Sequence, residues 1–101
     1  MNKYKRINAS EAKKLVVDVD NVLFCDVRSE ADYSESHDSR AINLTQGYLP
    51  LFISEMPKNK PVVVICYHGN SSQSVAQYLT VHGFEDVYSV DGGYEAWQNE
   101  E

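Results

Sequence analysis

The fold class follows from one stretch of sequence, Val62-Val63-Val64-Ile65-Cys66-Tyr67-His68-Gly69-Asn70-Ser71-Ser72. Its first four residues are apolar and β-branched, which is typical of a parallel strand buried on both faces. Pro61 marks where that strand can begin, because proline cannot donate to a sheet ladder. Apolar residues then recur at helical spacing at Val75, Ala76 and Leu79. The stretch therefore predicts a buried strand, a short polar loop and a helix.

This layout makes Cys66 the candidate nucleophile. Its thiol would lie at the carboxyl end of a parallel strand and face the N-terminus of the following helix, where amide groups favour the thiolate. Gly69 permits a positive φ, which lets successive N–H groups turn inward as an anion-binding nest. The other cysteine, Cys25, lies in an apolar run and is expected to be a small buried residue.

Composition limits the classes of protein to which the chain can belong. The 101 residues carry a net charge of −6, and 43% of them are hydrophobic. A single domain, residues 1–101, is expected at this length. The negative charge disfavours nucleic acid and anionic membranes as partners. An anionic substrate would have to be held by local groups, against the field of the whole chain.

The cysteines and the termini indicate a cytoplasmic protein. Two cysteines without regular spacing argue against a disulfide scaffold or a zinc site, and they fit a reducing compartment. No apolar segment follows Met1–Arg6, so no signal peptide is expected, and no apolar run reaches membrane-spanning length. His37 and His82 are expected to be structural, because neither has the neighbours of a metal site. We expect no metal and no cofactor.

Strands and helices alternate along the whole chain. The apolar runs predict strands at residues 4–7, 22–25, 41–44, 62–65 and 87–90, with helices that start near residues 8, 29, 48, 71 and 94. Asn8 and Glu11 have the spacing of a capping box. Such alternation indicates an α/β domain with a mainly parallel sheet. The loops Asp26–Arg28, Cys66–Ser72 and Asp91–Gly93 would then meet at one edge of it.

Four segments of the chain, in the same order, resemble the rhodanese-homology domain, and most of all the single-domain bacterial thiosulfate sulfurtransferases of the GlpE type. The four segments are Phe24-Cys25-Asp26-Val27-Arg28, Ser36-His37 through Ala41-Ile42-Asn43, Cys66-Tyr67-His68-Gly69-Asn70-Ser71-Ser72, and Val87-Tyr88-Ser89-Val90-Asp91-Gly92-Gly93-Tyr94-Glu95-Ala96-Trp97. The resemblance implies a sheet of five parallel strands with helices on both faces and the cysteine loop as the active site. It also implies transfer of sulfane sulfur from thiosulfate to cyanide, a thioredoxin-like protein or another thiol, through a Cys66 persulfide.

Two positions depart from the family pattern. Many rhodaneses have glycine where this chain has Ser36, and many have a basic residue where it has Ser71. Without that positive charge, anion binding is expected to depend mainly on the backbone amides of residues 67–71. The expected substrate-binding residues are Tyr67, His68, Gly69, Asn70, Ser71 and Ser72.

The supporting residues can be interpreted in more than one way. Asp26 and Arg28 form a predicted pair that braces the cysteine loop or merely satisfies local backbone groups. His68 either assists Cys66 or faces solvent. Ser71 and Ser72 are expected both to donate hydrogen bonds to the persulfide and to cap the helix. Trp97 and Tyr94 are expected to pack against the sheet.

Two other function classes remain open at this point. A persulfide carrier or interaction domain would hand sulfur to a partner protein without turning over free thiosulfate. A cysteine-based phosphatase or arsenate reductase would need an arginine after a longer loop, to grip a tetrahedral oxyanion with two hydrogen bonds. Positions 71 and 72 are both serine, which disfavours that class.

Overall fold

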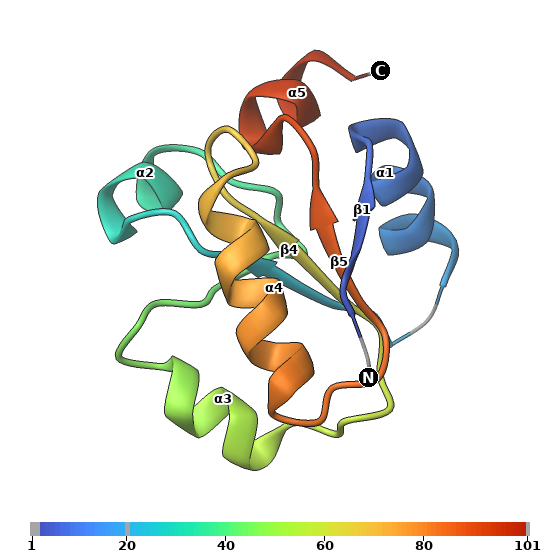
Figure 1. Ribbon diagram of the computed structural model, residues 1–101. Coiled ribbons are helices and arrows are strands. Elements are labelled where there is room, and N and C mark those ends of the chain that lie inside the picture. The colour runs from blue at the N-terminus through green and yellow to red at the C-terminus, as the bar shows by residue number, and fades with distance from the viewer. Residues whose placement is uncertain (1–2, 20, 101) are drawn as a thin grey trace.

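The computed structural model describes residues 3–19 and 21–100, and its centre is a sheet of five parallel strands (Figure 1). The strand order is β1-β5-β4-β2-β3, and every neighbouring pair is parallel. The elements in chain order are β1 (Lys5–Ile7), α1 (Ala9–Asp18), β2 (Leu23–Asp26), α2 (Glu30–Glu35), β3 (Ile42–Asn43), α3 (Leu49–Glu55), β4 (Val62–Ile65), α4 (Ser71–Val81), β5 (Val87–Val90) and α5 (Gly93–Asn99). The α/β class and the five-stranded parallel sheet are confirmed.

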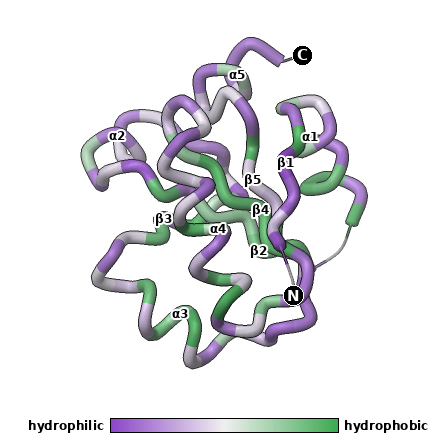
Figure 2. The backbone as a smooth tube through the Cα atoms, in the orientation of Figure 1, coloured by the Kyte–Doolittle hydropathy of each residue, from purple (hydrophilic) through white to green (hydrophobic). Residues whose placement is uncertain are grey.

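The central strand β4 is buried on both faces, as its run of valines predicts. Val62 and Val64 belong to the core under α3 and α4, whereas Val63 and Ile65 belong to the core under α1 and α5. All four side chains are fully buried. Figure 2 shows the same arrangement, with hydrophobic strands in the middle of the molecule and more hydrophilic segments around them.

The parallel register brings the ends of three strands to one edge of the sheet. Asp26 of β2 lies beside Ile65 of β4, and the next amide of the chain, that of Val27, donates to the Ile65 carbonyl at 2.8 Å. On the other side of β4, the Tyr94 amide that follows β5 donates to the Cys66 carbonyl at 2.7 Å. The predicted meeting of the three loops is therefore confirmed.

The ends of β1, β2 and β3 differ by at most one residue from those predicted, and β4 and β5 match the prediction. β1 begins at Lys5, not at Tyr4, and β2 runs one residue further along the chain than expected. β3 has only two residues, because it pairs with β2 at just two positions on the edge of the sheet. The predicted turn at residues 18–21 includes Asp20, which lies outside the described residues.

Helix ends follow local chemistry that is visible in the sequence. Asn8 accepts from the Glu11 amide and the Glu11 side chain accepts from the Asn8 amide, which is the predicted capping box. Gly83 ends α4 with a φ of +101°, and the Phe84 amide bonds back to Leu79. Within the described residues, no helix has both the length and the apolar character needed to traverse a bilayer.

The Asn8→Ala substitution should lower the free energy of unfolding by about 1 kcal/mol, because it removes one half of the capping box. Urea denaturation followed by circular dichroism would measure this loss. Ser10→Ala, at an exposed position in the first turn of the same helix, is the control and should change stability by less than about 0.5 kcal/mol. Equal losses in the two variants would contradict the role given to Asn8.

Candidate active site

Cys66 follows β4 directly, and its sulfur is held by the loop that comes next. The Gly69 amide donates to Cys66 Sγ at 3.1 Å. The thiol in turn donates to Ser72 Oγ at 3.3 Å, and Ser72 Oγ is 2.8 Å from Ser89 Oγ of β5. The side chain is almost fully buried, with 3% of its surface exposed. An amide donor at this distance stabilises negative charge that develops on the sulfur during a reaction.

Gly69 is required at its position for two reasons. Its φ of +94° is one that residues with a side chain rarely adopt. A Cβ added there would also lie 2.7 Å from the backbone nitrogen of Gly92. The amide that points at the sulfur therefore depends on a residue without a side chain.

The first turn of α5 holds the cysteine loop from the other side. The Tyr94 amide donates to the Cys66 carbonyl, and the Glu95 amide donates to the Tyr67 carbonyl at 3.2 Å. Gly93 makes this approach possible, because a Cβ there would lie 2.4 Å from the Cys66 carbonyl oxygen. The segment Asp91-Gly92-Gly93 is thus as much a part of the site as the cysteine loop itself.

The predicted substrate-binding residues do not all face the sulfur. Gly69 and Ser72 are buried and bond to it, whereas Tyr67, His68, Asn70 and Ser71 are exposed on the outside of the loop. Among the described contacts, the charged partner of His68 is Glu95, with Nδ1 3.8 Å from Oε1.

The prediction that Ser71 and Ser72 cap α4 is wrong. The helix begins at Ser71, and its N-cap is Asn70, whose side chain makes no capping hydrogen bond. A capping side chain needs an extended backbone at the N-cap, but Asn70 is already helical, with φ −94° and ψ −57°.

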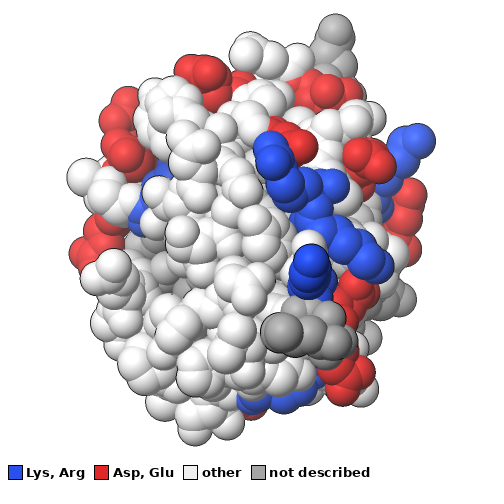
Figure 3. Space-filling model, viewed as in Figure 1, with Lys and Arg blue, Asp and Glu red and all other residues white. Residues whose placement is uncertain are grey.

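A cavity of about 350 Å³ lies beside the loop, between the start of α4 and the start of α3. Its walls carry no charged side chain; they are formed by Val27, Leu44, Thr45, Gln46, Leu49, Ser71, Ser74 and Val75. Figure 3 shows the surrounding face of the molecule as largely uncharged, whereas Lys and Arg side chains gather over β1. No charged side chain of this lining would attract an anion into the cavity.

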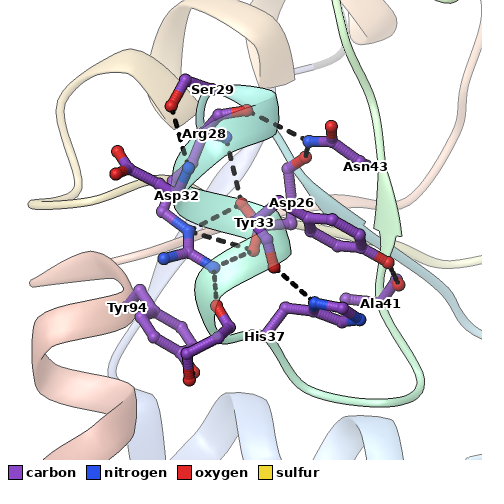
Figure 4. Close-up of polar contacts among 10 residues, drawn as sticks. Asp26, Arg28, Ser29, Asp32, Tyr33, His37, Ala41, Asn43 and Tyr94 are labelled. Atoms are coloured by element: carbon purple, nitrogen blue, oxygen red, sulfur yellow. Dashed lines mark hydrogen bonds and ion pairs between the residues drawn. The ribbon is translucent and has the colours of Figure 1, made fainter.

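Asp26 and Arg28 form a buried ion pair behind the loop. Arg28 Nη2 lies 2.7 Å from Asp26 Oδ2, and the two side chains are 4% and 1% exposed. Burial opposes the charge of Arg28, but the hydrogen bond and the negative charge of Asp26 keep its pKa above the ordinary value. Asn43 donates to the carbonyls of Asp26 and Arg28, which ties β3 to the same group (Figure 4).

Arg28 is linked to the cysteine loop through Tyr94. The guanidinium carbon is 3.8 Å from the centre of the Tyr94 ring, and Nη2 also donates to the Ser36 carbonyl (Figure 4). Ser36 Oγ is 2.7 Å from the Tyr94 hydroxyl, a bond that a glycine at position 36 could not make. The pair thus holds α5, and α5 in turn holds the Cys66 carbonyl.

The remaining histidines and Cys25 lie away from the sulfur. His37 stacks on Tyr33 at 3.6 Å, and His82 packs against Tyr78. Cys25 is fully buried, and burial raises its pKa well above the ordinary thiol value. The part of the chain that the structure describes holds no group of three or more His, Cys, Asp or Glu residues able to bind a metal.

Three residues that support the cysteine loop were not identified from the sequence; they are Ser89, Gln73 and Tyr4. Ser89 is a polar residue at a fully buried position of an otherwise apolar strand, which is the signal that could have revealed it. Gln73 donates to the Gly69 carbonyl and accepts from the Tyr4 hydroxyl. Tyr4 and Gln73 carry no local signal of this kind, because the hydrogen bond between them joins residues that are 69 positions apart in the sequence.

Comparison with known proteins places this geometry among sulfurtransferases. A family described as the rhodanese-like domain matches residues 8–100. The chain is 42% identical to thiosulfate sulfurtransferase GlpE of Tolumonas auensis, over 98% of this chain and 92% of that protein. It is 45% identical to the protein of the same name from Coxiella burnetii, over 94% of this chain and 88% of the relative. A rhodanese-like domain protein from Staphylococcus aureus superposes with a TM-score of 0.81 at 27% identity, over 92% and 90% of the two chains.

The Gly93→Ala substitution should lower the free energy of unfolding by about 2–4 kcal/mol, because the new Cβ collides with loop backbone and the φ of +60° is strained. Urea denaturation is the measurement. Gly47→Ala is the matched control: a Cβ at Gly47 meets nothing within 4 Å, so its effect should stay below about 0.5 kcal/mol. A Gly93→Ala protein as stable as the control would show that the loop and α5 are not tightly packed.

Proposed function

The chain belongs to the rhodanese-like domain family, and from this premise we infer that it is a thiosulfate sulfurtransferase. One observation in the structure carries the inference: a buried thiol at the end of a parallel strand receives an amide hydrogen bond from Gly69 at 3.1 Å. That environment suits a sulfur atom that carries negative charge as the attacking thiolate before the first transfer step and as the leaving group after the second. We propose that residues 1–101 work as one domain.

In the first half-reaction, the Cys66 thiolate would attack the outer, sulfane sulfur of thiosulfate. A bond forms between Sγ and the sulfane sulfur, the sulfur–sulfur bond of thiosulfate breaks, and sulfite leaves with the bonding electron pair. Cys66 is then a persulfide. The Gly69 amide and the Ser72 hydroxyl lie within hydrogen-bond distance of Sγ, which supports their role in stabilising the charge.

In the second half-reaction, an acceptor takes the outer sulfur of the persulfide. Cyanide or a thiolate attacks that sulfur, and the bond to Sγ breaks with return of the electron pair to Cys66. A stabilised thiolate serves both halves, as the attacking form in one and as the leaving group in the other. This is a ping-pong reaction through a covalent enzyme form. Thioredoxin-like proteins and other thiols in a reducing cytoplasm are the acceptors that we propose.

Two alternatives remain, of which one is disfavoured by an observation and the other is separated by an experiment. A phosphatase or arsenate reductase would need a cation to grip a tetrahedral oxyanion, but Arg28, the arginine behind the loop, is paired with Asp26. A persulfide carrier would use the same Cys66 and would differ only in its acceptor. The ratio of turnover on free thiosulfate to transfer onto a thiol protein separates carrier from enzyme.

The Cys66→Ser substitution should abolish sulfur transfer, whereas Cys25→Ser should retain most of it, because only Cys66 lies at the loop. Thiocyanate formation from thiosulfate and cyanide measures the activity, and mass spectrometry detects the added sulfur on Cys66. The buried hydroxyl in Cys25→Ser should cost about 1–3 kcal/mol of stability, so folding is checked first by circular dichroism. Equal loss of activity in two folded variants would rule out Cys66 as the nucleophile.

Replacing the exposed Ser71 with arginine should lower the KM for thiosulfate about fivefold, because a cation at the loop adds roughly 1 kcal/mol of attraction for the dianion. The improvement should shrink as salt is raised. Val81→Arg adds the same charge at the exposed far end of α4, about 15 Å away along the helix axis, and should change KM by less than about twofold. Equal improvement in both variants would mean that overall charge, and not the loop, controls binding.

A further inference from the structure

The hydrogen bond to the catalytic sulfur depends on the conformation of a single glycine. Gly69 has a φ of +94°, and its amide points at Cys66 Sγ. Glycine has the largest backbone freedom of any residue, so something must hold it in this one conformation. The helix start gives little help, because the Asn70 side chain forms no cap.

Gln73 supplies that restraint from the first turn of α4. Its Nε2 donates to the Gly69 carbonyl oxygen at 2.8 Å. The amide of Gly69 bonds to Sγ, and the carbonyl of the same residue bonds to Gln73. Two hydrogen bonds on opposite sides of one residue set both of its backbone torsions. Loss of the Gln73 bond would leave the Gly69 carbonyl without this partner, so that packing against Gly92 alone would restrain the residue.

Tyr4 fixes which way the Gln73 amide faces. The Tyr4 hydroxyl donates to Gln73 Oε1 at 3.0 Å, which leaves Nε2 directed at Gly69. Tyr4 precedes β1, packs against the core under α3 and α4, and is half-buried. A chain of hydrogen bonds therefore runs from the edge of the sheet through Gln73 and Gly69 to Cys66 Sγ.

We propose that Gln73 is a positioning residue for sulfur transfer, and that Tyr4 orients it. This proposal rests on the function inferred above, since it concerns the same sulfur. Gln73 does not touch Sγ in the structure. It acts by keeping the Gly69 N–H directed at the sulfur, so that both the thiolate and the departing sulfur of the persulfide are stabilised.

The test compares Gln73→Met with Gln77→Met. Methionine keeps the length and the helix propensity of glutamine but makes no comparable hydrogen bond. Gln77 lies on the same helix one turn later and is exposed, so it controls for the substitution itself. Circular dichroism and thermal unfolding establish that the two variants are folded.

Three readouts follow the sulfur and its amide directly. In Gln73→Met, alkylation of Cys66 by iodoacetamide at pH 7 should be about fivefold slower, the rate equivalent of about 1 kcal/mol for one hydrogen bond. The Gly69 amide proton should move upfield in the NMR spectrum, because it loses a hydrogen bond to sulfur. The kcat for sulfur transfer should fall by a similar factor. Gln77→Met should match the wild type in all three.

The outcomes are decisive in both directions. The proposal would be overturned if a folded Gln73→Met protein had the wild-type alkylation rate and an unchanged Gly69 amide shift. It would also be overturned if Gln77→Met lost as much alkylation rate and kcat as Gln73→Met. If Gln73→Met does not fold, the Tyr4→Phe variant is the test. Its alkylation rate should be about twofold to threefold lower than that of the wild type, and the chemical shift of the Gly69 amide proton should change. An unchanged rate and an unchanged shift would refute the proposal. Alkylation and NMR need no thiosulfate, so they test the positioning role even if the chain does not transfer sulfur.

Discussion

The close contact between the cysteine loop and the first turn of α5 is the constraint on which the site depends. Gly69 lies against Gly92, and Gly93 lies against the carbonyls of Cys66 and Tyr67, at distances that leave no room for a Cβ. Two amides of α5 then satisfy the loop carbonyls. Because α5 binds the carbonyls of the loop, the loop keeps a conformation in which the Gly69 amide points at the sulfur.

The charged side chains of the molecule add little to the stabilisation of a sulfur anion, so that the backbone amide of Gly69 dominates it. The chain carries a net charge of −6, and Arg28, behind the loop, is neutralised by Asp26 and covered by Tyr94. The cavity beside the loop has no charged wall. Stabilisation of sulfur anions is therefore local and directional, which suits a group that must be both nucleophile and leaving group. The cost is weak long-range attraction for an anionic donor.

The ion pair and the aromatic ring behind the loop form a second layer of support. Asp26 fixes Arg28, Arg28 stacks on Tyr94, and the Tyr94 amide bonds to the Cys66 carbonyl. Ser36 joins this layer through the Tyr94 hydroxyl, so the serine that departs from the family pattern takes a specific part in the packing. Removal of one member would expose a buried charge or loosen α5, which links the stability of the domain to the geometry of its sulfur.

Local patterns in the sequence determined the fold class, the strand that precedes Cys66 and the capping box of α1. Alternation of strand and helix, the run Val62–Ile65 and the pair Asn8 and Glu11 act over a few residues, so they can be interpreted without knowledge of distant contacts. The position of Cys66 directly after a buried strand was likewise predictable, because it is itself a local feature.

Tertiary structure alone decided how the loop is held. Gln73 and Tyr4 meet across 69 positions of sequence, and Ser89 reaches Ser72 from a neighbouring strand. The exposed positions of His68 and Ser71 were equally unpredictable, because the side of a loop that faces the sulfur is set by the packing of α5 against it. Hydrogen bonds between distant segments form only after the sheet has brought the segments together. The local sequence pattern of either segment therefore cannot predict these bonds.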